Sequence, residues 1–285
     1  MQEVIANKSF KMAWTPEALA PYWTGGRMGG LFTEERTLFY DELTSSNVEA
    51  ARLARQGAEE GTLVVADAQS GGKGRLGRVW TSPAGVNLYF SMVMRPKISP
   101  ENAAQMTLLT GVAGHEAMQR LQVPGVSIKW PNDLMVGSRK LGGILTEMNV
   151  RSSGVRWVII GVGLNVNLEL DQVSREMRHR VTSIRALTGR LMDRVEVLGS
   201  FLESFAKWRY CFDIEGFTPV RRRWLEGAHE LGRRVQVNLT HTRFSGRALD
   251  LDQDGFLLVE RDNGQVSRVL AGDVALLDDA VDANH

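Results

Sequence analysis

Residues 126–148 read VSIKWPNDLMVGSRKLGGILTEM, and this stretch decides the fold. Its apolar residues predict one strand at Val126–Trp130 and a second at Leu141–Met148, with a sharp turn between them. Lys129 stands at the end of the first strand, and functional side chains gather where loops leave a rigid sheet. The alternative is structural: Lys129 extends from the sheet edge into water, and Asn132-Asp133 only form the turn.

Strands and helices alternate on both sides of this stretch. Further strands are predicted at Thr62–Asp67, Asn87–Arg95 and Val155–Val162. The spacing of apolar residues predicts helices at Pro16–Trp23, 48–61 and Glu101–Gln122, and a helix-rich stretch over about 182–230. The second helix follows Thr44, Ser45 and Ser46, which are good N-cap residues. The mixed order predicts an α+β fold in which helices pack on one face of a mixed β-sheet.

The last fifty residues have a different pattern. Asp254-Gly255 and Asn263-Gly264 are strong hairpin-turn signals. Short alternating segments surround them, at Arg233–Leu239, Phe244–Asp252, Gly255–Asp262 and Val266–Leu270. Closely spaced strands with tight turns predict a small β-barrel. We expect an N-terminal extension or linker at 1–37, a large domain at 38–230, the barrel at 231–279 and a tail at 280–285.

Composition excludes several classes of protein. The chain has 285 residues and a formal net charge of +1, from 34 Lys+Arg against 33 Asp+Glu, so no overall basic footprint for nucleic acid exists. Cys211 is the single cysteine, which excludes an internal disulfide and a zinc site built from several thiols. We expect it to be a buried structural thiol. Neither a signal peptide nor an apolar run of about 18 residues is found, so we expect a cytoplasmic protein without a membrane span.

A glycine-rich basic loop follows the strand at Thr62–Asp67. Residues 69–80 read QSGGKGRLGRVW, with Lys73, Arg75 and Arg78 between four glycines. Glycines let the backbone approach a ligand, and the cations favour an anion, most naturally a phosphate. The P-loop pattern is absent, because GK is not followed by Ser or Thr. The alternative is a solvated, mobile basic hairpin.

A third motif, GVGLNVN at 161–167, follows the strand at Val155–Val162. Glycines at alternate positions permit close approach of a ligand, and Asn165 and Asn167 could read an adenine edge through donor and acceptor pairs. The motif is weak alone, since glycine-rich strand ends are common.

Together the three motifs resemble those of the biotin–protein ligase family. The family signature is a GRGRxGRxW loop, a KWPND turn with a following KxxGIL, and a GxGxN strand end. Here these stand in the same order as GGKGRLGRVW, KWPND…KLGGIL and GVGLNVN, with TSSN before the helix at 48–61. The resemblance covers roughly residues 38–278. It implies a catalytic domain like that of class II aminoacyl-tRNA synthetases and biotin ligases, with an SH3-like C-terminal barrel. Lys73 departs from the pattern, because the family usually has arginine there, and lysine lacks the forked donor pair.

The resemblance implies a two-step, ATP-dependent reaction. Biotin is activated to biotinyl-5′-adenylate with Mg²⁺ present, and biotin is then transferred to a lysine of the biotin carboxyl carrier domain of a carboxylase. Lys73, Arg75 and Lys129 are the expected catalytic residues, stabilising charge on the phosphoryl oxygens and at the carboxyl–phosphate junction. The loop at 70–79 is expected to order over the adenylate and exclude water.

The binding residues follow from the same resemblance. The biotin site is expected to comprise Ser45, Ser46, Asn47, Gln69, Lys73, Gly74, Arg75 and Lys129. The ATP and adenylate site is expected to comprise Arg75, Arg78, Trp80, Asn132, Lys140, Asn165 and Asn167, with Trp80 packed against adenine. Lys140 is as readily a salt-bridged structural lysine as a phosphate ligand. Metal ligands cannot be identified from the sequence, although Asp133 is a candidate.

Three other functions compete with this interpretation. A lipoate–protein ligase shares the fold and the adenylate chemistry. A biotin-responsive repressor would carry an N-terminal winged helix, but only about forty residues precede TSSN, and they hold one helix candidate and no cationic stripe. We therefore expect no DNA binding. A non-catalytic biotin-binding module would not need Arg75 and Lys129. A homodimer is left open.

Overall fold

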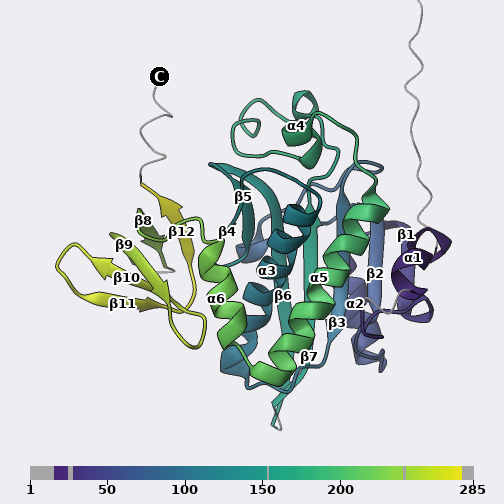
Figure 1. The fold of residues 1–285 in the computed structure, drawn as a ribbon, viewed down its shortest axis with the longest axis horizontal. Helices are drawn as coiled ribbons and strands as arrows, with labels where there is room; N and C mark the ends of the chain where they lie inside the picture. The colour runs from purple at the N-terminus through teal and green to yellow at the C-terminus, as the bar shows by residue number, and fades with distance from the viewer. Residues whose placement is uncertain (1–15, 25–27, 153, 240–241, 278–285) are drawn as a thin grey trace, which may run out of the picture.

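The computed structural model describes residues 16–24, 28–152, 154–239 and 242–277, and a seven-stranded sheet forms the centre of its large domain (Figure 1). The strand order is β1-β2-β3-β7-β6-β5-β4. β1 and β2 are parallel, and the other neighbouring strands are antiparallel. The strands are β1 Thr37–Leu43, β2 Leu63–Gln69, β3 Leu88–Met94, β4 Val126–Lys129, β5 Asp133–Val136, β6 Arg139–Arg151 and β7 Gly154–Leu164. The predicted mixed sheet is thus confirmed.

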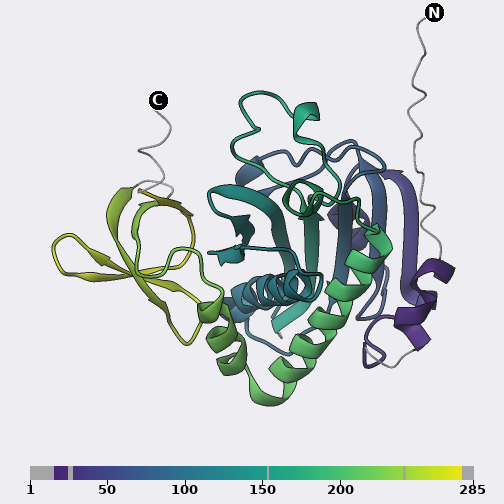
Figure 2. The same cartoon turned by 45° about the horizontal axis from the view of Figure 1, so that its top comes forward.

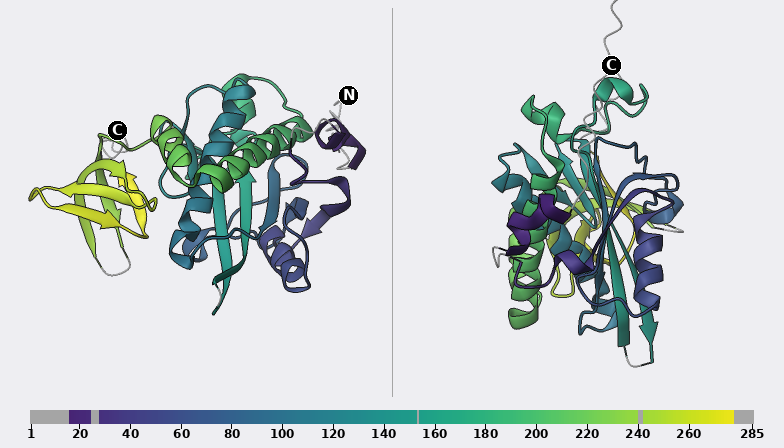
Figure 3. Two further views of the ribbon diagram at one scale, coloured as in Figure 1. Left: turned by 60° about the horizontal axis from the view of Figure 1, so that its bottom comes forward. Right: turned by 90° about the vertical axis from the view of Figure 1, so that its right-hand side faces the viewer.

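Helices cover both faces of this sheet, not one face as expected. α3 (Ala104–Arg120) and α5 (Arg194–Glu215) lie on one face, and α2 (Ser46–Arg55) lies on the other (Figure 3). The central strands are apolar on both sides, so both faces must be covered. In β2, Val65 belongs to the core under α3 and α5, whereas Val64 packs with the buried residues under α2.

Shorter helices complete the large domain. The predicted helix at Pro16–Trp23 is present as η1 (Pro16–Leu19) and α1 (Ala20–Thr24), and Leu19 is fully buried in the main core. The predicted buried thiol of Cys211 is only half-buried, on α5. The remaining short helices are η2 Glu34–Arg36, η3 Arg75–Gly77, η4 Pro100–Ala103, η5 Leu170–Gln172, α4 Ile184–Thr188 and α6 Thr218–Glu226.

The C-terminal segment forms a separate antiparallel five-stranded sheet in the order β11-β10-β9-β8-β12. Its strands are β8 Arg234–Asn238, β9 Arg243–Leu251, β10 Leu257–Arg261, β11 Val266–Val269 and β12 Asp273–Leu276. It lies beside the β4 edge of the large sheet and next to α6 (Figure 2). The arrangement agrees with the predicted SH3-like domain. No helix in the described ranges is long and apolar enough to cross a membrane.

The link between the two sheets is hydrogen-bonded to β4. The Ile128 N–H donates to the Gly227 carbonyl at 2.7 Å, and the His229 N–H donates to the Ile128 carbonyl at 2.8 Å. The Trp130 indole N–H donates to the carbonyl of Gly255 in the C-terminal sheet at 3.2 Å. The turn that contains the KWPND motif is therefore fixed against the C-terminal domain.

Candidate active site

One cavity of about 620 Å³ collects residues from all three sequence motifs. It also receives Asp273 from the C-terminal sheet. The predicted site residues that line it are Ser45, Ser46, Asn47, Gln69, Lys73, Gly74, Arg75, Arg78, Trp80, Asn132, Asp133, Lys140 and Asn165. Lys129 and Asn167 are the predicted site residues that do not line it.

The start of α2 forms one wall of the cavity. Ser45 is the N-cap residue by position, but its side chain makes no capping hydrogen bond. The Ser46 N–H instead donates to Gln69 Oε1 at 2.8 Å, and Gln69 Nε2 donates to Ser82 Oγ at 2.9 Å. Side chains far apart in sequence thus orient the TSSN segment, and the two serine hydroxyls are not used to cap the helix.

The glycines of the third motif make room for this wall and for Trp80. A Cβ at Gly161 would lie 1.9 Å from Asn47 Oδ1, and a Cβ at Gly163 would lie 2.5 Å from Cε2 of Trp80. Both distances are far below van der Waals contact. Glycine is therefore required at both positions for the observed packing, as the close approach predicted for this motif demands.

The basic loop folds over the cavity as a hairpin. The Gly74 N–H donates to the Arg78 carbonyl at 2.7 Å, and the Trp80 N–H donates to the Gly72 carbonyl at 2.9 Å. At the tip Leu76 has a φ of 55° and is 72% exposed. A left-handed leucine costs roughly 1–2 kcal/mol, so this tip is locally strained.

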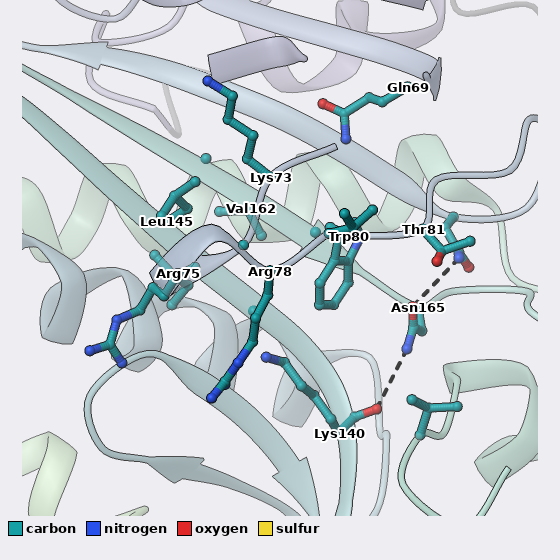
Figure 4. Close-up of a pocket in the computed structure, with 18 of the residues that line it drawn as sticks. Gln69, Lys73, Arg75, Arg78, Trp80, Thr81, Lys140, Leu145, Val162 and Asn165 are labelled. Carbon is teal, nitrogen blue, oxygen red and sulfur yellow. Dashed lines mark hydrogen bonds between the residues drawn. The ribbon is translucent and has the colours of Figure 1, made fainter. Parts of the chain in front are cut away.

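The cations of the loop point in two directions (Figure 4). Arg75 and Arg78 extend toward the side of Lys140, whereas exposed Lys73 extends away from them. Arg75 donates to Asn132 Oδ1 at 3.0 Å and to the Gly272 carbonyl at 3.2 Å. Burial lowers the pKa of the Arg75 guanidinium, and the charge of Asp273 opposes this shift. Arg75 and Arg78 are thus gathered at one end of the cavity.

Trp80 forms a platform in the centre of the site. Its ring lies against Gly143 and Gly163, and Lys140 Nζ lies 5.3 Å from the ring centroid. Lys140 also pairs with Asp133 at 2.7 Å. The indole N–H of Trp80 is buried and has no hydrogen-bond acceptor. A buried donor without a partner is costly, and this nitrogen lies against Gly163 on the sheet side of the ring.

The three asparagines predicted to bind ATP differ in what they can offer. Asn132 donates to the Ile144 carbonyl at 2.7 Å, and Asn165 donates to the Thr182 carbonyl at 3.0 Å, while both residues line the cavity. Asn167 donates to the Met192 carbonyl and accepts from the Met192 N–H, both at 2.9 Å. Its amide therefore holds the chain before α5 in place.

Lys129 is half-buried at the end of β4 and is paired across the strands with Asp133. Paired residues in antiparallel strands have Cα atoms only about 4.5–5.5 Å apart, so Lys129 lies next to a residue that lines the cavity. Behind it, Glu230 is fully buried and accepts the Trp130 N–H at 2.7 Å. Burial raises the pKa of Glu230 to about 8, although the charge of Lys129 opposes this shift.

The sequence did not predict the wall of the cavity that residues 168–181 form, or the contact of the cavity with the C-terminal sheet. Leu168, Val173, Ser174, Met177 and Val181 line the cavity from an irregular stretch with neither helical nor strand periodicity. Asp273 carried no signal either, because its place depends on how the second sheet docks. Among the described residues, no group of three His, Cys, Asp or Glu side chains could hold a metal ion.

Family models match both parts of the chain. The Biotin/lipoate A/B protein ligase family matches residues 40–165, and the Biotin protein ligase C terminal domain matches residues 231–277. The "Bifunctional ligase/repressor BirA" of Bacillus subtilis is 36% identical over 250 residues, which cover 87% of this chain and 77% of that protein. The chain belongs to the biotin protein ligase family. The resemblance seen in the motifs is confirmed.

Other members of the biotin protein ligase family agree in sequence and structure. The "Biotin--[acetyl-CoA-carboxylase] ligase" of Paracoccus denitrificans is 32% identical, over 78% of this chain and 92% of the relative. The structure of biotin protein ligase from Aquifex aeolicus in complex with biotin and ATP has a TM-score of 0.73 and 30% identity. The matched region comprises 84% of this chain and 97% of the Aquifex aeolicus chain.

Proposed function

We propose that this biotin ligase binds biotin and ATP together in the cavity of about 620 Å³ and joins them as biotinyl-5′-adenylate. The observation that carries the proposal is the division of the cavity lining. Hydroxyl and amide groups of Ser45, Ser46 and Gln69 suit a neutral polar ring, whereas Arg75 and Arg78 suit phosphates. The match of residues 231–277 to the Biotin protein ligase C terminal domain favours biotin over lipoate.

Charge repulsion is the main obstacle to the first step. A carboxylate oxygen of biotin attacks the α-phosphorus of ATP, and pyrophosphate leaves. Two anions must be held in line, and such placement contributes roughly 7–11 kcal/mol. Arg75 would exchange its present acceptors, Asn132 and Gly272, for phosphoryl oxygens. Lys129, next to Asp133, would stabilise charge at the carboxyl–phosphate junction.

The second step moves biotin to protein. The amine of a lysine on a biotin carboxyl carrier domain attacks the carbonyl carbon of the adenylate, an amide bond forms, and AMP leaves. Trp80 and the hairpin at 72–80 would cover the adenylate and exclude water. The position of the Trp80 ring over Gly143 and Gly163 permits this. We assign residues 38–230 to the catalytic domain and 231–279 to the C-terminal domain, and we expect the reaction in the cytoplasm, where ATP is available.

The lining residues fit a Mg²⁺ ion that arrives with ATP. Mg²⁺ is commonly held by one or two carboxylates together with substrate phosphates. Asp133 lines the cavity with a buried Oδ1, and its charged partner Lys140 could move to a phosphate. Asp133 would hold the ion, which when bound neutralises phosphate charge.

A parallel assay with two acids separates this function from that of a lipoate ligase. The protein is incubated with ATP and either biotin or lipoate, and release of pyrophosphate is followed. We expect release with biotin and at most a trace with lipoate; equal or greater release with lipoate would reject the assignment.

The absence of DNA binding stays a prediction, since Lys8 and Lys11 lie outside the described residues.

A further inference from the structure

Three buried polar side chains at the cavity wall, Ser46, Asn47 and Ser91, form a hydrogen-bond network that ends at the exposed carboxylate of Glu147. Ser91 on β3 is fully buried, and its Oγ lies 2.8 Å from Ser46 Oγ and 2.7 Å from Asn47 Oδ1. Asn47 Nδ2 lies 2.7 Å from Glu147 Oε2 and 3.2 Å from the Leu145 carbonyl. Ser46 and Asn47 are 5% and 3% exposed, so their hydrogen bonds to Ser91 are largely shielded from bulk water.

The chemistry of these groups fixes the direction of every hydrogen bond. The two partners of Asn47 on the β6 side, a carboxylate and a carbonyl, can only accept, so the NH₂ of Asn47 must face them. The amide oxygen of Asn47 therefore faces Ser91 and must receive its hydroxyl proton. A serine has one such proton. Consequently the 2.8 Å contact between Ser46 and Ser91 is a hydrogen bond that Ser46 donates.

Ser46 is thereby left without a donor for the cavity that it lines. Its hydroxyl proton goes to Ser91, and its backbone N–H goes to Gln69 Oε1 at 2.8 Å. Only the oxygen lone pairs of its hydroxyl remain. A ligand that brings an N–H to this point gains a hydrogen bond, whereas one that brings a carbonyl or a sulfur atom leaves the oxygen unpaired.

We propose that Asn47 and Ser91 are positioning residues that hold the hydroxyl of Ser46 as a fixed hydrogen-bond acceptor, and so select acids whose ring carries an N–H group. The inference rests on the proposed function and names the part of the ligand that this wall reads. The ureido ring of biotin carries two N–H groups, whereas the dithiolane ring of lipoate carries none. Sites built to pair a ligand donor reject analogues that lack it far more strongly than apolar pockets reject extra bulk.

A double-mutant cycle on Ser46 and Ser91 tests the proposal. Dissociation constants for biotin and for ATP are measured by titration calorimetry for the wild type, Ser46→Ala, Ser91→Ala and the double variant. We expect Ser91→Ala to weaken biotin about tenfold, because the Ser46 proton loses its acceptor, and to leave ATP affinity within about twofold. Once Ser46 is alanine, Ser91→Ala is expected to have little further effect on biotin affinity, because the Leu145 carbonyl and Glu147 still hold Asn47.

Controls separate this role from a loss of packing. Thr107→Val removes a hydroxyl–hydroxyl hydrogen bond of 2.8 Å outside the cavity, and we expect unchanged biotin affinity. Ser91→Cys keeps the size of the side chain with weaker hydrogen bonding, so it replaces Ser91→Ala if the alanine variant does not fold. Additive losses in the cycle would overturn the role of Ser91 and leave the biotin site in place. Normal biotin affinity of Ser46→Ala would overturn both the role of Ser91 and the assignment of this wall to biotin.

Discussion

Arg75 Nη1 lies 3.9 Å from Asp273 Oδ1, so a cation of the glycine-rich loop faces the first residue of β12 in the C-terminal sheet. Arg78 pairs with the same carboxylate. The loop that the sequence predicts to bind phosphate is therefore held by an anion of the protein itself. Substrate phosphates would compete with Asp273 for both guanidinium groups.

Removing this carboxylate is expected to loosen the loop. Ion pairs at a protein surface contribute roughly 0.2–1 kcal/mol each, so Asp273→Asn is expected to speed tryptic cleavage after Arg75 and Arg78 by about two- to fivefold. The measurement is the rate of appearance of the two fragments by mass spectrometry. Asp262→Asn, which breaks the exposed Arg234 pair of 2.8 Å on the same sheet, is the control. Equal cleavage rates in the two variants would show that Asp273 does not hold the loop.

Arg75→Ala is expected to reduce adenylate formation by about 10²-fold or more, because a phosphate-directed cation is lost from the closed site. Folding is expected to persist, since the loop adds no residue to the apolar core. Pyrophosphate release with biotin and ATP is the readout, and Arg52→Ala on the exposed face of α2 is the charge control. Near-normal release by the Arg75 variant would remove this residue from the mechanism.

The two glycines of β7 are expected to affect different substrates. Gly161→Ala forces Asn47 to move, so the biotin KM is expected to rise about tenfold or more, with a smaller change for ATP. Gly163→Ala displaces Trp80, so the ATP KM is expected to rise by the larger factor. Each variant serves as the control for the other in a steady-state assay. The same pattern in both variants would show that the cavity is not divided in this way.

Glu230 gives the protein a pH-dependent stability. Burial raises its pKa to about 8 from 4.5, so the folded chain keeps a proton that the unfolded chain releases. The free energy of unfolding therefore falls as pH rises from about 4.5 to about 8, by at most about 1.4 kcal/mol per unit, and then levels off. Glu230→Gln does not titrate, so its free energy of unfolding is expected to rise relative to that of the wild type as the pH increases across this window.

Urea denaturation at about pH 5.5, 7 and 8.5 measures the effect. Glu226→Gln, an exposed carboxylate on α6, controls for the removal of a charge near the link between the sheets. A constant difference between wild type and Glu230→Gln at all three pH values would mean that Glu230 does not titrate in this range.

Elements with strong apolar patterns could be predicted from the sequence, and weakly patterned ones could not. β3 is buried along its whole length and was predicted within one residue at each end. β1 is an edge strand with two exposed residues, and β5 has only four residues and directly follows a turn. Neither strand therefore had a clear alternation of apolar and polar residues. β12 also has only four residues, and its partner β8 lies far away in sequence.

Much of the candidate site could also be predicted, because glycines and cations in fixed motifs determine local chemistry. Arg75, Trp80 and Gln69 all line the cavity. Ser91 and Asp273 could not be predicted, since each acts through a residue distant in sequence and follows no motif. The direction in which Lys73 points was equally out of reach, because it depends on the hairpin that the loop forms.

The most direct test of the central claim is the intact mass of an acceptor protein. The chain is incubated with ATP, Mg²⁺, biotin and a biotin carboxyl carrier domain, and a parallel sample receives lipoate. We predict that the carrier gains the mass of one biotin, less one water, at a single lysine, and gains nothing in the lipoate sample. A carrier of unchanged mass in the biotin sample, or one modified by lipoate instead, would contradict the account.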